Sequence, residues 1–108
     1  MKRYQVVFTP RAERQLSELY SFIVENGSET TAEAFVGGIV GDCLSLATFP
    51  ERGTRRDDIR PSLRVKGYKR RVSIAFSVDA AAGVVVIHGV FYGGQDFESL
   101  LGDTMTDD

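Results

Sequence analysis

The sequence offers little from which a disulfide or a metal site could be built. Cys43 is the only cysteine, so no internal disulfide can form, and its place in an apolar helical pattern predicts a buried thiol. His88 is the only histidine, and no second histidine or cysteine stands at ligand spacing. We therefore expect no metal and no cofactor, and we expect His88 to be a half-buried structural residue.

Long apolar runs and a leader segment are also absent. No run approaches the ~20 residues of a membrane span, and no basic-then-apolar leader opens the chain, so we expect a cytoplasmic protein without membrane contact. The chain has 108 residues, of which 43% are apolar and 26% are charged. These values predict a single domain over residues 1–108 with one hydrophobic core, and residues 102–108 are expected to form a frayed tail.

Charge is distributed unevenly along the chain. Residues 51–71, called here the basic belt, contain nine Lys or Arg and three acids, a net charge of +6. The whole chain carries −2, so the remainder carries −8. Such asymmetry predicts a charged partner. Three partners remain open for the belt: an acidic protein, which we favour, the chain's own acidic helices, and nucleic acid, which is disfavoured because Tyr68 is the only nearby ring for base stacking.

The first half of the chain predicts one strand and two helices. Residues 2–8 alternate apolar and polar positions and predict a strand. Thr9 and Pro10 then form a helix start, a hydroxyl cap followed by a proline whose missing N–H is not needed there. An amphipathic stripe follows, and Asn26-Gly27 is expected to end this helix in a left-handed cap.

The second helix is predicted to start within Ser28–Thr31, with Thr30 and Glu33 at capping-box spacing, and to stop at Phe49-Pro50. Glycines are unusual in its interior, where each costs up to about 1 kcal/mol relative to alanine. The glycines in question are Gly37, Gly38 and Gly41. We favour close packing of these glycines against the first helix. The alternative is a smooth groove that receives a helix of another chain.

The second half predicts three strands after a charged loop over residues 51–61. The first spans residues 63–66 and is broken by Gly67, the second spans residues 69–78, and the third spans residues 84–92. The third is apolar on both faces, which is typical of a central or covered strand. The order β-α-α-β-β-β predicts an α+β fold, with a helical hairpin packed on one face of a small, mostly antiparallel four-stranded sheet. A short helical turn is also expected over residues 95–101.

Five motifs in this order carry a resemblance to a known family. They read Y-x-V-x-F-T-P-R-A, F-P-E-R-G-T, D-I-R-P-x-L-R-V, I-A-F-S-V-D and V-F-Y-G-G-Q-D. Together they span Tyr4 to about Phe97, and the chain resembles the ParE/RelE superfamily of bacterial toxin–antitoxin toxins. The resemblance implies the same order of elements and a toxin that is neutralised by an antitoxin.

The two branches of that superfamily imply different chemistry. RelE-like toxins are implied to cut messenger RNA on the ribosome with basic residues in the last two strands, and those positions fall here on Ser73 and near Gly89. Without cations to neutralise the phosphate, cleavage should be poor, so we favour the ParE-like branch. It implies a ParD-like antitoxin and DNA gyrase as the target. The alternatives are an endonuclease that uses Arg70 or Arg71 with Tyr92, and a toxin that has lost its activity.

The candidate site residues are therefore partner-binding residues, and no catalytic residue is predicted in the favoured branch. Arg60 and Arg71 are expected to clamp a partner carboxylate, because a guanidinium forms two parallel hydrogen bonds with it. Tyr92 is expected to be a sheet-edge aromatic, and Asp96 to cap the helical turn that follows or to pair with the basic belt. The full set is Arg60, Arg64, Lys69, Arg70, Arg71, Tyr92 and Asp96.

Overall fold

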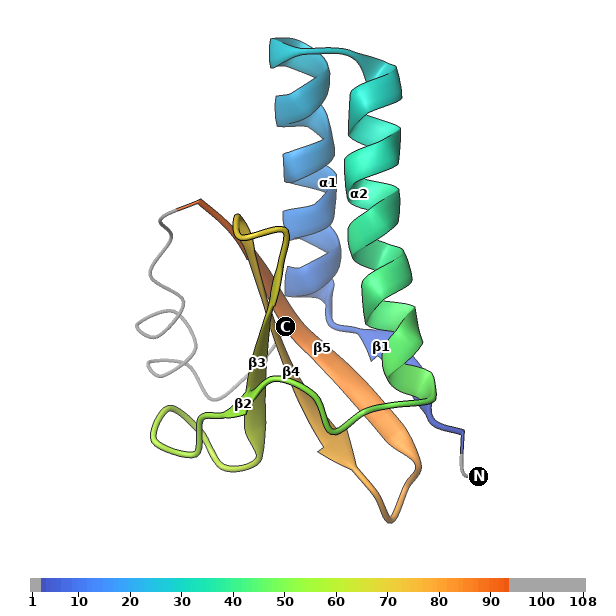
Figure 1. Cartoon of the computed structure of the whole chain (residues 1–108), viewed down its shortest axis with the longest axis vertical. Coiled ribbons are helices and arrows are strands. Elements are labelled where there is room, and N and C mark those ends of the chain that lie inside the picture. Colours follow the sequence, from blue (N-terminus) through green and yellow to red (C-terminus); the bar gives the residue numbers. More distant parts are fainter. Residues whose placement is uncertain (1–2, 94–108) are drawn as a thin grey trace.

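The computed structural model describes residues 3–93, which fold into a helical hairpin packed against a five-stranded sheet (Figure 1). Asp96 and the predictions for residues 95–108 lie outside the described residues. The α+β prediction is confirmed, and the sheet has one strand more than predicted. The elements are β1 (Gln5–Phe8), α1 (Pro10–Asn26), α2 (Glu29–Leu44), a 3-10 turn (Ser45–Ala47), β2 (Thr54–Arg55), β3 (Leu63–Tyr68), β4 (Val72–Asp79) and β5 (Val84–Tyr92).

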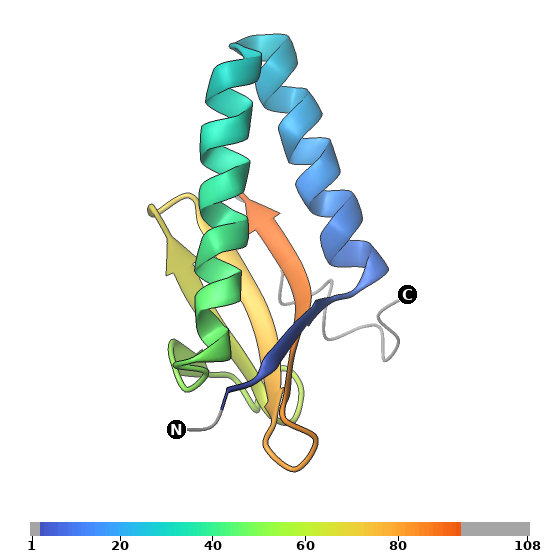
Figure 2. The same cartoon turned by 90° about the vertical axis from the view of Figure 1, so that its right-hand side faces the viewer.

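The strand order in the sheet is β1-β5-β4-β3-β2. Strands β2 to β5 form an antiparallel meander, whereas β1 pairs with β5 in parallel. A parallel pair requires a long crossover, and α1 and α2 lie within it. Strand β5 is central between β1 and β4, as its apolar sequence predicted. The helices lie together on one face of the sheet, and the tip of their hairpin projects beyond it (Figure 2).

Helix α1 begins as predicted and ends differently. The Thr9 side chain accepts a hydrogen bond from the N–H of Ala12 at 3.2 Å, and Pro10 occupies the first turn. The predicted left-handed cap is wrong, because Gly27 has a φ of −154°. Instead, the Asn26 side chain donates to the carbonyl of Phe22 at 2.9 Å and satisfies one of the last carbonyls of the helix.

Helix α2 starts within the predicted window, but a different residue caps it. The Ser28 hydroxyl accepts from the N–H of Thr31 at 3.0 Å, so Ser28 replaces the predicted box of Thr30 and Glu33. The helix ends at Leu44 and continues as a 3-10 turn. The chain therefore leaves helical geometry before it reaches Phe49-Pro50.

The helical glycines do not pack against α1 as we favoured. A side-chain carbon at Gly38 would collide with the Tyr68 hydroxyl of β3, so this glycine admits a residue of the sheet. Added carbons at Gly37 and Gly41 would meet no neighbouring atom within 4 Å. These two positions leave a smooth, open helix face.

The turn between β3 and β4 differs from the prediction. Strand β3 continues through Gly67, which pairs with Ser73, and the chain reverses at residues 69–71. Lys69 and Arg70 have positive φ values of 49° and 64°, the conformation that hairpin turns require at their two central positions. Glycine or asparagine usually occupies such positions, and a lysine or arginine there costs roughly 1–2 kcal/mol per residue.

The main core lies between the helical hairpin and the sheet. Phe76, Ile39 and Leu46 are fully buried in it. A smaller cluster of Leu63, Ala75 and Phe91 lies on the opposite face of the sheet. Neither helix among the described residues combines the length and apolar character needed to cross a membrane.

Candidate partner-binding surface

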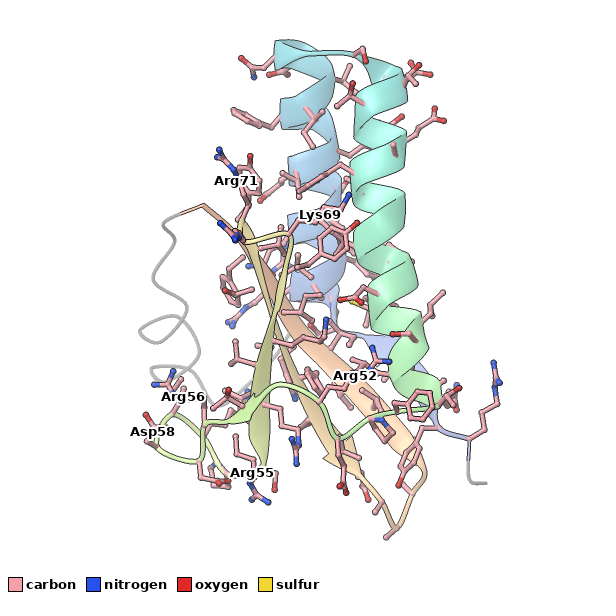
Figure 3. All side chains as sticks on the ribbon, in the orientation of Figure 1. Arg52, Arg55, Arg56, Asp58, Lys69 and Arg71 are labelled. Carbon is pink, nitrogen blue, oxygen red and sulfur yellow. The ribbon has the colours of Figure 1, made fainter. Side chains whose placement is uncertain are left out.

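The basic belt is not one surface, because β3 separates its two ends. Lys69 and Arg71 lie at the β3–β4 turn, whereas Arg55 and Arg56 lie beside the start of β3 (Figure 3). A strand of six residues spans roughly 20 Å. Charges that far apart are beyond the screening length of about 8–10 Å at physiological salt. The two ends of the belt are therefore separate electrostatic features.

The end near β2 is paired with acids of the belt itself. Arg55 makes two hydrogen bonds with Asp57, at 3.0 and 3.1 Å, and Arg56 makes two with Asp58, at 3.0 and 2.9 Å. The hydrogen bonds from Arg55 hold the pKa of Asp57 below its ordinary value, and the N–H of Ser62 adds to this effect. Arg56 likewise lowers the pKa of Asp58. Two of the nine cations are therefore matched locally.

The middle of the belt is tied to the second helix and the turn after it. Lys66 forms an ion pair with Asp42 of α2. Arg64 donates to the carbonyl of Arg52 at 3.2 Å, and Arg52 in turn donates to the Ser45 hydroxyl at 2.9 Å. Internal pairing thus accounts for part of the belt. A role of Arg64 toward a partner stays a prediction.

The β3–β4 turn presents three of the four exposed cations of the belt, the fourth being Arg55. Lys69, Arg70 and Arg71 are all exposed, and the Lys69 ammonium lies 5.7 Å from the centre of the Tyr68 ring. The N–H of Gly93 donates to the carbonyl of Arg71 at 2.9 Å, which places Arg71 beside the end of β5. The structure therefore brings Arg71 close to Tyr92, whereas Arg60 lines a different cavity near His88.

Aromatic rings gather beside these cations. Phe35 of α2 makes edge-to-face contacts with Tyr68 at 5.9 Å and with Tyr92 at 6.1 Å between ring centres. Phe22 of α1 is 53% exposed. Phe22 and Tyr92 together line two adjoining hollows of ≈ 220 and ≈ 290 Å³. We call these hollows the aromatic groove; Gln15, Glu18, Leu19, Ile23, Asn26, Gly27, Thr31, Phe35 and Val90 complete the lining.

The sequence predicted Tyr92 and the turn cations but not Phe22 or Phe35. Phe35 lay in the predicted core stripe of α2, and its ring does pack there while also lining the groove. Phe22 lay outside the predicted stripe of α1. A single exposed apolar residue is common on protein surfaces, so the sequence alone contained no signal for it.

Chemically, the groove suits binding better than bond breaking. It offers apolar rings and lies near the exposed cations of the β3–β4 turn, which together match an amphipathic segment that carries acids at the end facing the turn, away from Glu18. Among residues 3–93, no three His, Cys, Asp or Glu side chains are placed to hold a metal ion.

Cys43 is fully buried on α2, as the sequence predicted. Burial, with a further contribution from Asp42, raises the pKa of this thiol to about 12. We expect the native protein at pH 8 to be unreactive toward Ellman's reagent, because the thiolate is the nucleophile, and to release one equivalent of chromophore after denaturation. Rapid stoichiometric labelling of the native protein would contradict this placement.

The comparisons with known proteins concern the family and the fold of the chain. The model of the ParE toxin family of the type II toxin–antitoxin system, parDE, matches residues 6–97. The chain belongs to the ParE toxin family. The matched region of this ParE-family protein contains all described helices and strands except the first residue of β1.

Two solved structures share the fold of this ParE-family chain. One is a chromosomal ParDE toxin–antitoxin system from P. aeruginosa, with a TM-score of 0.72 and 21% identity, covering 84% of this chain and 97% of the other. The second is the RelBE2 toxin–antitoxin complex from Mycobacterium tuberculosis, with a TM-score of 0.63 and 21% identity, covering 88% and 97%. No curated protein matches the sequence.

Proposed function

We propose that this ParE-family toxin is neutralised by a ParD-like antitoxin that occupies the aromatic groove, and that its target is DNA gyrase. The observation that supports the antitoxin site is that the groove rings, of which Phe22 is exposed and Phe35 and Tyr92 are half-buried, lie near the exposed cations at the end of β5. The similar structures from P. aeruginosa and M. tuberculosis are both described as toxin–antitoxin systems or complexes, which supports an antitoxin partner.

The antitoxin in this proposal has a definite chemistry. An amphipathic helix would place its apolar residues against Phe22, Phe35 and Tyr92, and its acids would reach the β3–β4 turn. The strained backbone at Lys69 and Arg70 fits this role, because strained conformations cluster at binding sites as well as in tight hairpin turns. We expect a neighbouring reading frame to encode a ribbon-helix-helix protein with such an amphipathic tail.

The target is tested by DNA supercoiling. Purified toxin should inhibit supercoiling by gyrase in a concentration-dependent way, and the antitoxin should restore it. Full supercoiling activity at a large excess of toxin would reject the gyrase assignment. The same assay with an unrelated topoisomerase controls for general interference with DNA.

The antitoxin contact is tested by charge reversal at Arg71. A bidentate pair between charged groups contributes enough that Arg71→Glu should weaken antitoxin binding by about tenfold or more. Arg55→Glu, at the other end of the belt and also exposed, should leave the affinity within about twofold. Titration calorimetry of both variants gives the comparison. Equal affinities for the Arg71 variant and the unmodified toxin would exclude the predicted clamp.

A ribosome-dependent messenger-RNA endonuclease is the second candidate. It is favoured by the likeness to a RelBE2 complex and by the closeness of Arg71 and Tyr92 at the end of β5. Primer extension on cellular messenger RNA after induction separates the two candidates. Codon-positioned cuts that disappear with Tyr92→Phe would support cleavage and count against the gyrase proposal.

A further inference from the structure

A second cavity lies away from the aromatic groove, against strands β4 and β5. Its volume is ≈ 390 Å³, which is within the range of small-molecule sites. Ser77 alternates with Phe76 and Val78, whose side chains belong to the core beneath the helices, so the Ser77 side chain lies on the opposite face. The lining consists of Arg60, Pro61, Ser62, Leu63, Ser77, Val78, Asp79, Ala80 and His88.

A β-bulge brings His88 into this cavity. Ala75 pairs with Gly89 and Phe76 pairs with Ile87, so His88 is the extra residue on β5 at this bulge. Bulges redirect side chains and are often found beside functional sites. The imidazole Nε2 lies 2.7 Å from the Ser77 hydroxyl, and the side chain is almost fully buried. The cavity wall therefore contains a fixed hydroxyl–imidazole pair.

The loop between β2 and β3 contributes a cation, Arg60, to the same lining. The backbone around Arg60 is fixed, since its N–H donates to the carbonyl of Arg56 at 3.3 Å and its carbonyl accepts from Leu63 at 3.2 Å. Ser62 beside it has a φ of 66° and donates its N–H to Asp57 at 2.9 Å. A guanidinium and hydroxyls that line one cavity, one of the hydroxyls being held by an imidazole, form a set of donors suited to a phosphate group.

Asp79 adds a hydrogen-bond acceptor to the donors that line the cavity. It follows Ser77 by two residues on the same strand, roughly 7 Å away. Its Oδ1 accepts from the N–H of Ala82 at 3.0 Å, which holds the carboxylate in place. A carboxylate repels a bare phosphate but accepts hydrogen bonds from sugar hydroxyls. Among the described residues that line the cavity there is no Phe, Tyr or Trp, and His88 is held by Ser77, so they provide no platform for stacking a base.

We propose that this cavity binds a sugar phosphate, with the phosphate against Arg60 and the Ser77–His88 pair and the sugar hydroxyls against Asp79. This proposal does not rest on the proposed antitoxin site or on gyrase as the target. A small phosphorylated metabolite would bind the toxin at a site distinct from the aromatic groove.

Titration calorimetry of the full chain tests the proposal with ribose 5-phosphate, inorganic phosphate and ribose. Ribose 5-phosphate should bind saturably and at least about tenfold more tightly than inorganic phosphate, and ribose should not bind measurably. Arg60→Gln should weaken ribose 5-phosphate binding by about tenfold or more, as expected for the loss of a charged hydrogen-bond donor. Asp79→Asn should weaken the sugar phosphate while leaving inorganic phosphate unchanged.

The control variant is Arg71→Gln, which removes one positive charge from the far end of the sheet. Equal weakening by Arg60→Gln and Arg71→Gln would mean that only general charge attracts the ligand, and it would overturn the proposal. Failure of ribose 5-phosphate to saturate the protein at millimolar concentration would overturn it as well. Unfolding midpoints and near-ultraviolet circular dichroism verify that each variant is folded. If Arg60→Gln is unfolded, it is replaced by Arg60→Lys, which keeps the positive charge but loses the two parallel hydrogen-bond donors of the guanidinium.

Discussion

Truncation of Phe76 to alanine is expected to remove about 3–5 kcal/mol from the free energy of unfolding. Phe76 is fully buried in the middle of β4, within the core that joins the sheet to the helical hairpin. The substitution loses the transfer free energy of the ring and leaves a cavity in a closely packed region. Because domains of this size are stable by only about 5–15 kcal/mol, the variant should be largely unfolded at moderate denaturant concentrations. Urea unfolding followed by circular dichroism gives the value.

The matched control is Phe22→Ala. The Phe22 ring is 53% exposed in the aromatic groove, so its loss should change the free energy of unfolding by at most about 0.5–1 kcal/mol. Under our proposal it should nevertheless weaken antitoxin binding. A loss of less than about 1 kcal/mol in the Phe76 variant would show that this core is not packed as described.

Much of the fold could be predicted because its signals are local. The period of 3.6 residues, the Thr9-Pro10 start and the two-faced apolar run of β5 each depend on neighbouring residues. The parallel placement of β1 beside β5 could not be derived from such signals, because it depends on contacts between residues about 80 positions apart. Strand β2 was missed for another reason. It has two residues, too few for any alternation to be visible.

The basic belt shows why the site was predicted only in part. Nine cations close together in sequence suggested one surface, but an extended strand separates the cations at its two ends by its whole length. Arg55 and Arg56 are matched by acids two residues away, and Lys66 by an acid on α2. Lys69, Arg70 and Arg71 are left at a strained turn beside Tyr92. Phe35 lies near these residues only because of tertiary packing, which a local sequence pattern does not reveal.

Replacement of Gly53 by alanine is expected to destabilise the protein by about 2 kcal/mol or more. Gly53 has a φ of +74°, where a side chain is strained. An added carbon would also lie 2.9 Å from the carbonyl carbon of Val65, close to its oxygen, and backbone atoms there cannot rotate away. Thr54 pairs with Val65, so the clash should separate β2 from β3. Hydrogen exchange of the Arg56 amide, which donates to Leu63, should accelerate.

The same change at Gly37 is expected to have the opposite sign. Gly37 lies inside α2, its position is exposed, and an added carbon would meet no atom within 4 Å. Alanine there should therefore raise the free energy of unfolding by about 0.5–1 kcal/mol, because it restricts the unfolded chain more than glycine does. Since both variants add one methyl group, thermal unfolding of the pair isolates the role of position. Destabilisation by Gly37→Ala would mean that this helix face is covered in the folded protein, as it would be by the helix of another chain.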